Sequence, residues 1–67
     1  MAESHLEMAN RHVARGREIV IDQQLLIERL KIGGGPTREA ERLLETYEYS
    51  LRVFEDDLES ILAREDK

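Results

Sequence analysis

The sequence contains no cysteine, a single proline and no long apolar run. Without thiols the chain forms neither a disulfide nor a thiolate metal site, which fits a reducing compartment such as the cytoplasm. No apolar stretch approaches the roughly 20 residues that span a bilayer. The segment MAESHLEMAN lacks the basic stretch and apolar run of a signal peptide. The sequence therefore predicts a cytoplasmic protein that has neither disulfides nor a membrane segment.

With only 67 residues, the chain can form only a small hydrophobic core. A domain of this size buries only about 60% of the surface that its unfolded chain exposes. Such domains usually need a disulfide, a metal or a partner subunit for stability. With cysteine absent, association with a partner subunit is the expected source of stability.

The net charge of −5 lies entirely in the second half of the chain. Residues 1–36 hold five acidic and five basic residues, whereas residues 37–67 hold ten acidic and five basic ones. A general nucleic-acid binder needs a basic face, so this balance argues against one. The one small basic cluster leaves an alternative open, a nucleic-acid-associated regulator that uses Arg11, Arg15 and Arg17.

Two segments flank the only loop signal, the Gly-Gly-Gly-Pro sequence at residues 33–36. The β-branched run at 19–21 and the period-two alternation at 47–53 favour strands. The helical pattern is longer, because seam positions recur at steps of three and four through both segments. We therefore expect an all-α antiparallel two-helix hairpin, coiled-coil-like, with helices at about 5–32 and 38–64 in a single domain.

The seam between the two helices is formed by the residues at these steps. They are Leu6, Ala9, Val13, Gly16, Val20, Gln23, Ile27, Leu30, Ala40, Leu44, Tyr47, Leu51, Phe54, Leu58 and Ile61.

The ends of the helices carry capping signals. Ser4 and Glu7 form a capping box at the start of the first helix. We expect Gly33 to take the left-handed conformation that ends this helix, and Thr37 to cap the second.

Folding about the turn pairs positions whose numbers sum to about 70. Gly16 then faces Phe54, where the missing side chain makes room for the ring, and Gln23 faces the hydroxyl of Tyr47. A polar seam residue of this kind commonly sets register or oligomeric state. One flank is expected to carry two ion pairs, Arg17 with Glu55 and Lys31 with Glu41.

The first helix carries more large apolar residues than one seam can bury, which a helix tolerates only when it is covered on several sides. We expect a second copy of the chain to cover them, so that a homodimer forms a four-helix bundle with the first helices at its centre. The predicted oligomer interface consists of Ile19, Ile21, Leu25, Leu26, Ile32 and Leu43.

The chain offers little chemistry. His5, Met8 and His12 share one helical flank, and Asp57 lies opposite His12, so a weak metal site is conceivable. The simpler interpretation pairs His12 with Asp57 and leaves His5 in the first turn. The Glu-x-x-His motif of bundle di-iron sites and a phosphate-binding glycine loop are both absent. We expect no enzyme, no cofactor and no metal.

The first half carries Arg11-His-Val-Ala-x-Gly16, then Val20-x-x-Gln23, Ile27 and Leu30. The second half carries Thr37-x-x-Ala40-x-x-Leu43-Leu44-x-x-Tyr47-x-x-Ser50-Leu51. Over residues 9–51 this pattern resembles a group of very short helical-hairpin proteins of rhizobia-type alphaproteobacteria. The chain departs from the group at Ile19, where the others often carry a second histidine, and this weakens a metal role for that face. The group has no assigned function, so the resemblance implies the hairpin and adds no activity.

The sequence thus predicts a non-enzymatic helical protein that self-associates and serves as an interaction, assembly or regulatory module.

Overall fold

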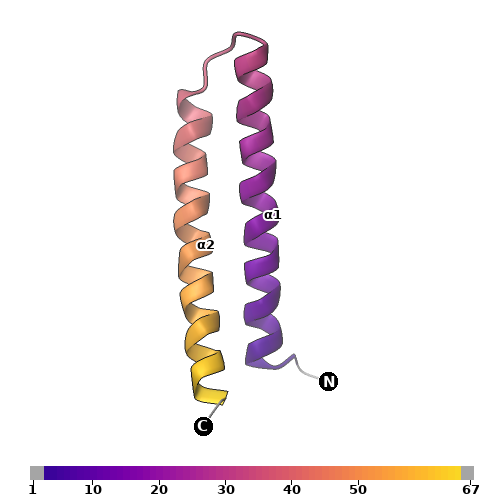
Figure 1. The fold of residues 1–67 in the computed structure, drawn as a ribbon, viewed down its shortest axis with the longest axis vertical. Helices are drawn as coiled ribbons and strands as arrows, with labels where there is room; N and C mark the ends of the chain where they lie inside the picture. The colour runs from indigo at the N-terminus through magenta and orange to yellow at the C-terminus, as the bar shows by residue number, and fades with distance from the viewer. Residues whose placement is uncertain (1–2, 66–67) are drawn as a thin grey trace.

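Two antiparallel helices lie side by side and are joined by one short turn (Figure 1). The computed structural model describes residues 3–65, with the backbone alone at residue 65. Helix α1 spans His5–Ile32 and helix α2 spans Arg38–Glu65, each of 28 residues. No strand occurs within residues 3–65. The all-α hairpin predicted from the seam pattern is confirmed, and both helices begin and end within one residue of the expected bounds.

Ser4 caps α1 as expected, because its Oγ accepts a hydrogen bond from the Glu7 amide at 3.1 Å. Helix α2 begins directly after Thr37, whose carbonyl accepts from the Glu41 amide at 2.8 Å. The Thr37 hydroxyl donates to Glu41 Oε1 at 3.3 Å. Thr37 thus lies just before α2 as expected of its cap, but its hydroxyl contacts a side chain of the first turn rather than a backbone amide.

The turn after α1 corrects the prediction for Gly33. Gly33 keeps a right-handed conformation, with φ −78° and ψ −3°, and Gly34 takes the left-handed one, with φ 73°. The Gly34 amide donates to the Lys31 carbonyl at 3.1 Å, and the Gly35 amide donates to the Leu30 carbonyl at 2.9 Å. These two bonds form a Schellman motif. In this motif the left-handed residue directly follows the C-cap. Gly33 is the C-cap, so the left-handed residue is Gly34, one position later than predicted.

The hairpin is a rod only one helix thick. It extends 52 × 22 × 13 Å, and its radius of gyration of 15.5 Å exceeds the roughly 11 Å of a compact domain of this length. Since a helix with its side chains is about 10–12 Å wide, a side chain of either helix has only one neighbouring helix to cover it.

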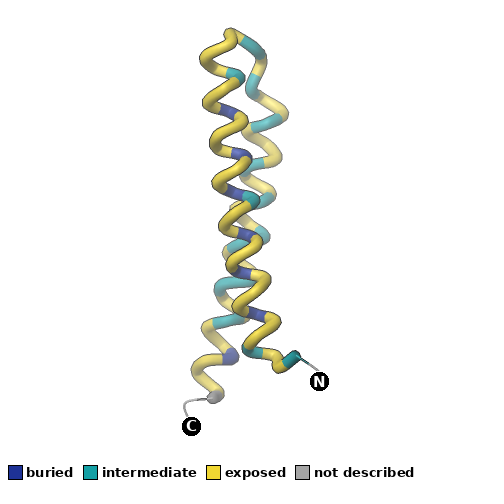
Figure 2. Tube along the Cα trace, turned by 90° about the vertical axis from the view of Figure 1, so that its right-hand side faces the viewer, coloured by how far each residue is buried: buried dark blue, intermediate teal, exposed yellow. Residues whose placement is uncertain are grey.

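Burial follows one side of α1 (Figure 2). The buried residues of α1 are Ala9, Val13, Gly16, Val20, Gln23 and Ile27. On α2, Ile61 is buried, whereas the seam residues Leu44, Tyr47, Leu51, Phe54 and Leu58 are half-buried. The predicted seam is therefore the contact between the helices, and it covers α1 more fully than α2.

Two large side chains of α2 lie close to α1 at Gly16. A Cβ placed on Gly16 would lie 3.1 Å from Leu51 Cδ1 and 3.7 Å from Phe54 Cδ2. Phe54 thus faces Gly16 as expected, and Leu51 lies closer still.

Gln23 does not use the partner that the register predicted. Its Nε2 donates to the carbonyl oxygen of Ala40 at 2.8 Å rather than to the Tyr47 hydroxyl. Inside a helix that carbonyl also accepts from the amide of Leu44, and a carbonyl oxygen has two lone pairs for two donors. The small side chain of Ala40 leaves the backbone open to the amide, which explains why Gln23 reaches it.

The two expected flank pairs have different outcomes. Arg17 Nη2 lies 3.4 Å from Glu55 Oε2, so this pair is confirmed. Within residues 3–65 no ion pair joins Lys31 to Glu41, since the Glu41 carboxylate lies against Thr37.

Candidate interaction surface

The face of α1 that turns away from α2 is apolar near the turn. Ile21, Leu25, Leu26 and Ile32 keep between 42% and 85% of their full exposure, and Ile19 is half-buried. We call these five residues the α1 patch. All five were predicted as interface residues, and the hairpin leaves four of them uncovered.

The α1 patch forms two columns along the helix. At about 100° per residue, Ile21, Leu25 and Ile32 lie on one side, and Leu26 and Ile19 lie on the other, within an arc of roughly 160°. Asp22 and Arg29 lie between the two columns. Both are exposed, and neither has an ion-pair partner within the described part of the chain.

Sequence reasoning missed Asp22 and Arg29. The sequence does place them on one helical face, because they are seven residues apart and the seam positions also recur every seven residues.

Leu43, the sixth predicted interface residue, is 46% exposed on α2. In the hairpin register it lies beside Leu26, so the apolar surface continues from α1 onto the start of α2. The remaining exposed apolar residues of α2 are more widely spaced, at Tyr49, Val53 and Leu62. Charged residues occupy its outer face between them, namely Glu45, Arg52, Asp56 and Glu59.

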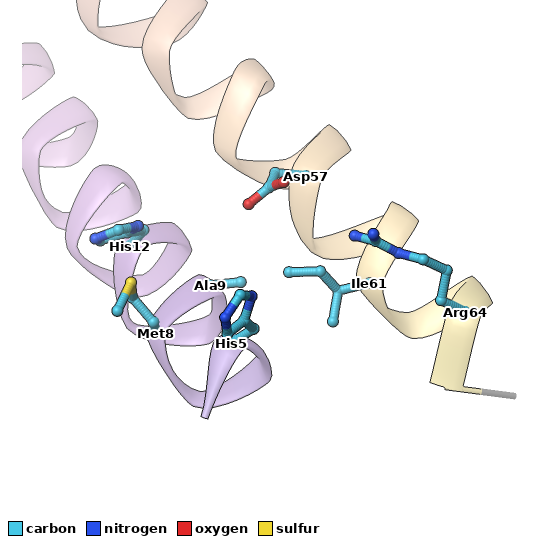
Figure 3. Close-up of a pocket in the computed structure, with 7 residues that line it drawn as sticks. All are labelled: His5, Met8, Ala9, His12, Asp57, Ile61 and Arg64. Atoms are coloured by element: carbon cyan, nitrogen blue, oxygen red, sulfur yellow. The ribbon is translucent and has the colours of Figure 1, made fainter. Parts of the chain in front are cut away.

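A hollow lies between the helices at the end away from the turn (Figure 3). Its lining consists of His5, Met8, Ala9, His12, Asp57, Ile61 and Arg64. The hollow unites the residues that the sequence suggested for a weak metal site.

The histidine and carboxylate side chains of the hollow do not form a metal-binding cluster. Within residues 3–65, no three His, Cys, Asp or Glu side chains come together in a way that could hold a metal ion. The His12 ring instead packs against Phe54, with ring centroids 5.1 Å apart and planes tilted by 37°. No ion pair joins His12 to Asp57 in the described region, because the imidazole lies against an aromatic ring.

The three arginines of the small basic cluster each have a carboxylate neighbour. Arg11 Nη2 lies 2.8 Å from Glu3 Oε1, in an ion pair without hydrogen-bond geometry. Arg15 pairs with Glu18 at 3.1 Å, and Arg17 pairs with Glu55 at 3.4 Å. These carboxylates reduce the positive charge that the cluster presents to a phosphate backbone.

No family model matches the chain, and no curated protein or solved structure is significantly similar to it. The resemblance of residues 9–51 to short alphaproteobacterial hairpin proteins therefore stays a prediction. Neither helix, over the residues described, is both long and apolar enough to span a membrane.

Proposed function

We propose that the protein is a non-enzymatic cytoplasmic module that acts by self-association. Two hairpins pair through α1 into a four-helix bundle, which serves as an interaction, assembly or regulatory unit. The observation that carries this proposal is the α1 patch, because four of its five apolar side chains stay exposed in the hairpin.

The total surface of the hairpin supports the proposal. The chain exposes 5560 Å², whereas a compact monomer of 7.8 kDa exposes about 4,400 Å² by the usual scaling with mass. The excess of about 1,200 Å² per copy is of the size that stable interfaces bury, since a typical interface removes about 800 Å² from each partner.

The hairpin core gives further support. No large side chain in the described region is more than 98% buried, and the buried apolar residues are Ala9, Val13, Val20, Ile27 and Ile61. Complete burial of a large aliphatic side chain contributes about 1.5–3 kcal/mol. Covering what remains exposed of the α1 patch in two copies would contribute on the order of 10 kcal/mol, before the entropy of association is subtracted.

Sedimentation equilibrium of the full chain at micromolar concentrations tests this function, with circular dichroism to follow unfolding. We expect a species of twice the 7.8 kDa chain mass and an unfolding midpoint that rises with protein concentration. A cooperatively folded species of one-chain mass would contradict the proposal.

A further inference from the structure

The α1 patch combines features that suit a contact with itself. Its two apolar columns flank one acid and one base, Asp22 and Arg29, which lie two helical turns apart. Both charges are exposed and lack ion-pair partners within residues 3–65. A surface of this kind is covered best by a partner that supplies apolar columns and the reversed order of charges.

We propose that the partner is a second copy of this chain, whose α1 packs antiparallel on the α1 patch about a two-fold axis between Leu25 and Leu26. This inference rests on the proposed self-association and specifies its geometry. Residues whose numbers sum to about 51 lie at the same level along the contact. Asp22 then faces the partner's Arg29, and Arg29 faces the partner's Asp22.

The same register matches the apolar side chains. The two-fold axis brings each apolar column against its own copy, so that Leu25 lies beside the partner's Leu25 and Leu26 lies beside the partner's Leu26. The apolar segment of α1 is centred near residue 25, so an axis at this point gives the greatest overlap of the two segments. Leu43 of α2 borders the contact beside Leu26, which extends the apolar surface that the second α1 covers.

Charge disfavours the antiparallel registers that are shifted by seven residues. A shift of seven residues keeps the same faces in contact, since seven residues are close to two turns. In one direction the shift places Asp22 against the partner's Asp22. In the other direction it places Arg29 against the partner's Arg29. Like charges in direct contact oppose association, so the register with opposite charges is favoured.

Charge also disfavours the parallel arrangement. In a parallel two-fold contact every residue lies level with its own copy, so Asp22 meets an aspartate and Arg29 meets an arginine. The antiparallel arrangement replaces both repulsive contacts by two equivalent attractive ones.

Charge exchange tests the orientation and the register together. Asp22→Arg alone and Arg29→Asp alone should each weaken the dimer about tenfold, since each change turns two attractive contacts into repulsive ones. The double variant Asp22→Arg/Arg29→Asp should restore the dissociation constant to near that of the wild type. Glu45→Lys, a charge reversal on the outer face of α2, is the matched control and should leave the dimer unchanged.

Mixing the two single variants tests whether positions 22 and 29 lie in the contact, whichever way the two α1 helices run. Between the two columns of the α1 patch, the Asp22→Arg chain carries two cations and the Arg29→Asp chain carries two anions. The mixture should therefore form heterodimers in preference to either homodimer. Native mass spectrometry with one chain isotope-labelled measures the ratio, and a statistical mixture of species would overturn the arrangement.

The absence of cysteine allows an independent test by disulfide cross-linking. Leu25→Cys lies beside the axis and should form a disulfide-linked dimer quickly under mild oxidation. Ile32→Cys should not, because its Cα lies about 20 Å from the same residue of the partner along the helix, and a disulfide needs Cα atoms within about 7 Å. A parallel contact would cross-link both variants equally.

These results separate the arrangement from the proposed function. A wild type of two-chain mass whose double variant is not restored, or whose Ile32→Cys variant links as fast as Leu25→Cys, would overturn the antiparallel arrangement and leave self-association standing. A folded wild type of one-chain mass would overturn both.

Discussion

Helices α1 and α2 have the same length and share one seam, but they bury very different shares of their residues. Helix α1 buries six residues against α2, whereas among residues 38–64 of α2 only Ile61 is buried. The buried residues of α1 are small or β-branched apart from Gln23, whereas the facing residues of α2 are larger, as at Tyr47 and Phe54. Large side chains on α2 reach over the small ones of α1 and remain half-exposed themselves.

The outer faces differ in the same sense. Four of the five large apolar residues exposed on the described part of α1 fall within the twelve positions 21–32, the fifth being Met8, whereas those of α2 are spread from Leu43 to Leu62 among charged residues. A helix with apolar residues on opposite sides is suited to the middle of an assembly, and one with a single apolar stripe is suited to its outside. The proposed self-association, with α1 inside and α2 outside, would suit this difference.

The largest expected effect comes from charging the α1 patch. Leu25→Glu/Leu26→Glu should abolish the dimer and leave an unfolded or molten monomer, because it places four carboxylates in the contact and removes apolar burial of several kcal/mol. Sedimentation equilibrium and thermal unfolding measure the change.

The matched control charges α2 instead. Tyr49→Glu/Val53→Glu replaces two exposed apolar residues of α2 and should leave both mass and unfolding midpoint nearly unchanged. Equal loss of the dimer in this variant would show that α2 contributes to the contact as much as α1 does.

The next effect concerns the narrow point of the seam. Gly16→Leu should destabilise the protein by about 1–3 kcal/mol, since a Cβ at Gly16 already lies 3.1 Å from Leu51 Cδ1 and a larger side chain would overpack the contact. Urea unfolding monitored by circular dichroism gives the change in the free energy of unfolding.

Gly16→Ala compares two opposing effects at the same position, the higher helix propensity of alanine and the crowding of its Cβ by Leu51. Glycine costs about 1 kcal/mol in a helix interior, and the crowding atom is the end of a half-buried side chain that can move. We therefore expect a change within about 1 kcal/mol of zero. A loss as large as that of Gly16→Leu would mean that Leu51 is held rigidly.

A smaller effect is expected at the polar residue of the seam. Gln23→Leu should raise the free energy of unfolding by up to about 1 kcal/mol, because the Ala40 carbonyl retains its partner in α2 and an apolar side chain replaces the amide. It should also broaden the distribution of oligomers, since the contact from Gln23 to Ala40 no longer sets the register of α1 against α2. Unfolding of this variant in buffer would show that the hydrogen bond is essential.

The smallest effect is expected at the flank between the helices. The pair of Arg17 with Glu55 is exposed, at 3.4 Å, so a double-mutant cycle with alanine at both positions should give a coupling of about 0–1 kcal/mol. The coupling should disappear at about 1 M salt. A coupling that persists there would indicate that a second copy shields this flank from solvent.

Local patterns were sufficient for the two helices. Steps of three and four placed the seam, Ser4 and Glu7 marked the start of α1, and the glycine run marked the turn. Each of these signals involves residues within about one helical turn of one another, where backbone hydrogen bonding alone sets the geometry. The excess of apolar residues on α1 was likewise visible in the sequence, because three consecutive apolar residues, as at 19–21 and 25–27, cannot all face one helix.

Only the tertiary structure decided the contacts between the helices. The sequence placed Gln23 opposite Tyr47, but the amide bonds the backbone of Ala40, and His12 packs on Phe54 rather than pairing with Asp57. Within the turn, the left-handed residue proved to be Gly34 rather than Gly33. Such choices depend on side-chain rotamers and on the relative height of two helices to within one residue, a difference of about 1.5 Å. Periodicity determines which face of a helix is buried, and packing against the neighbouring helix determines which atoms meet there.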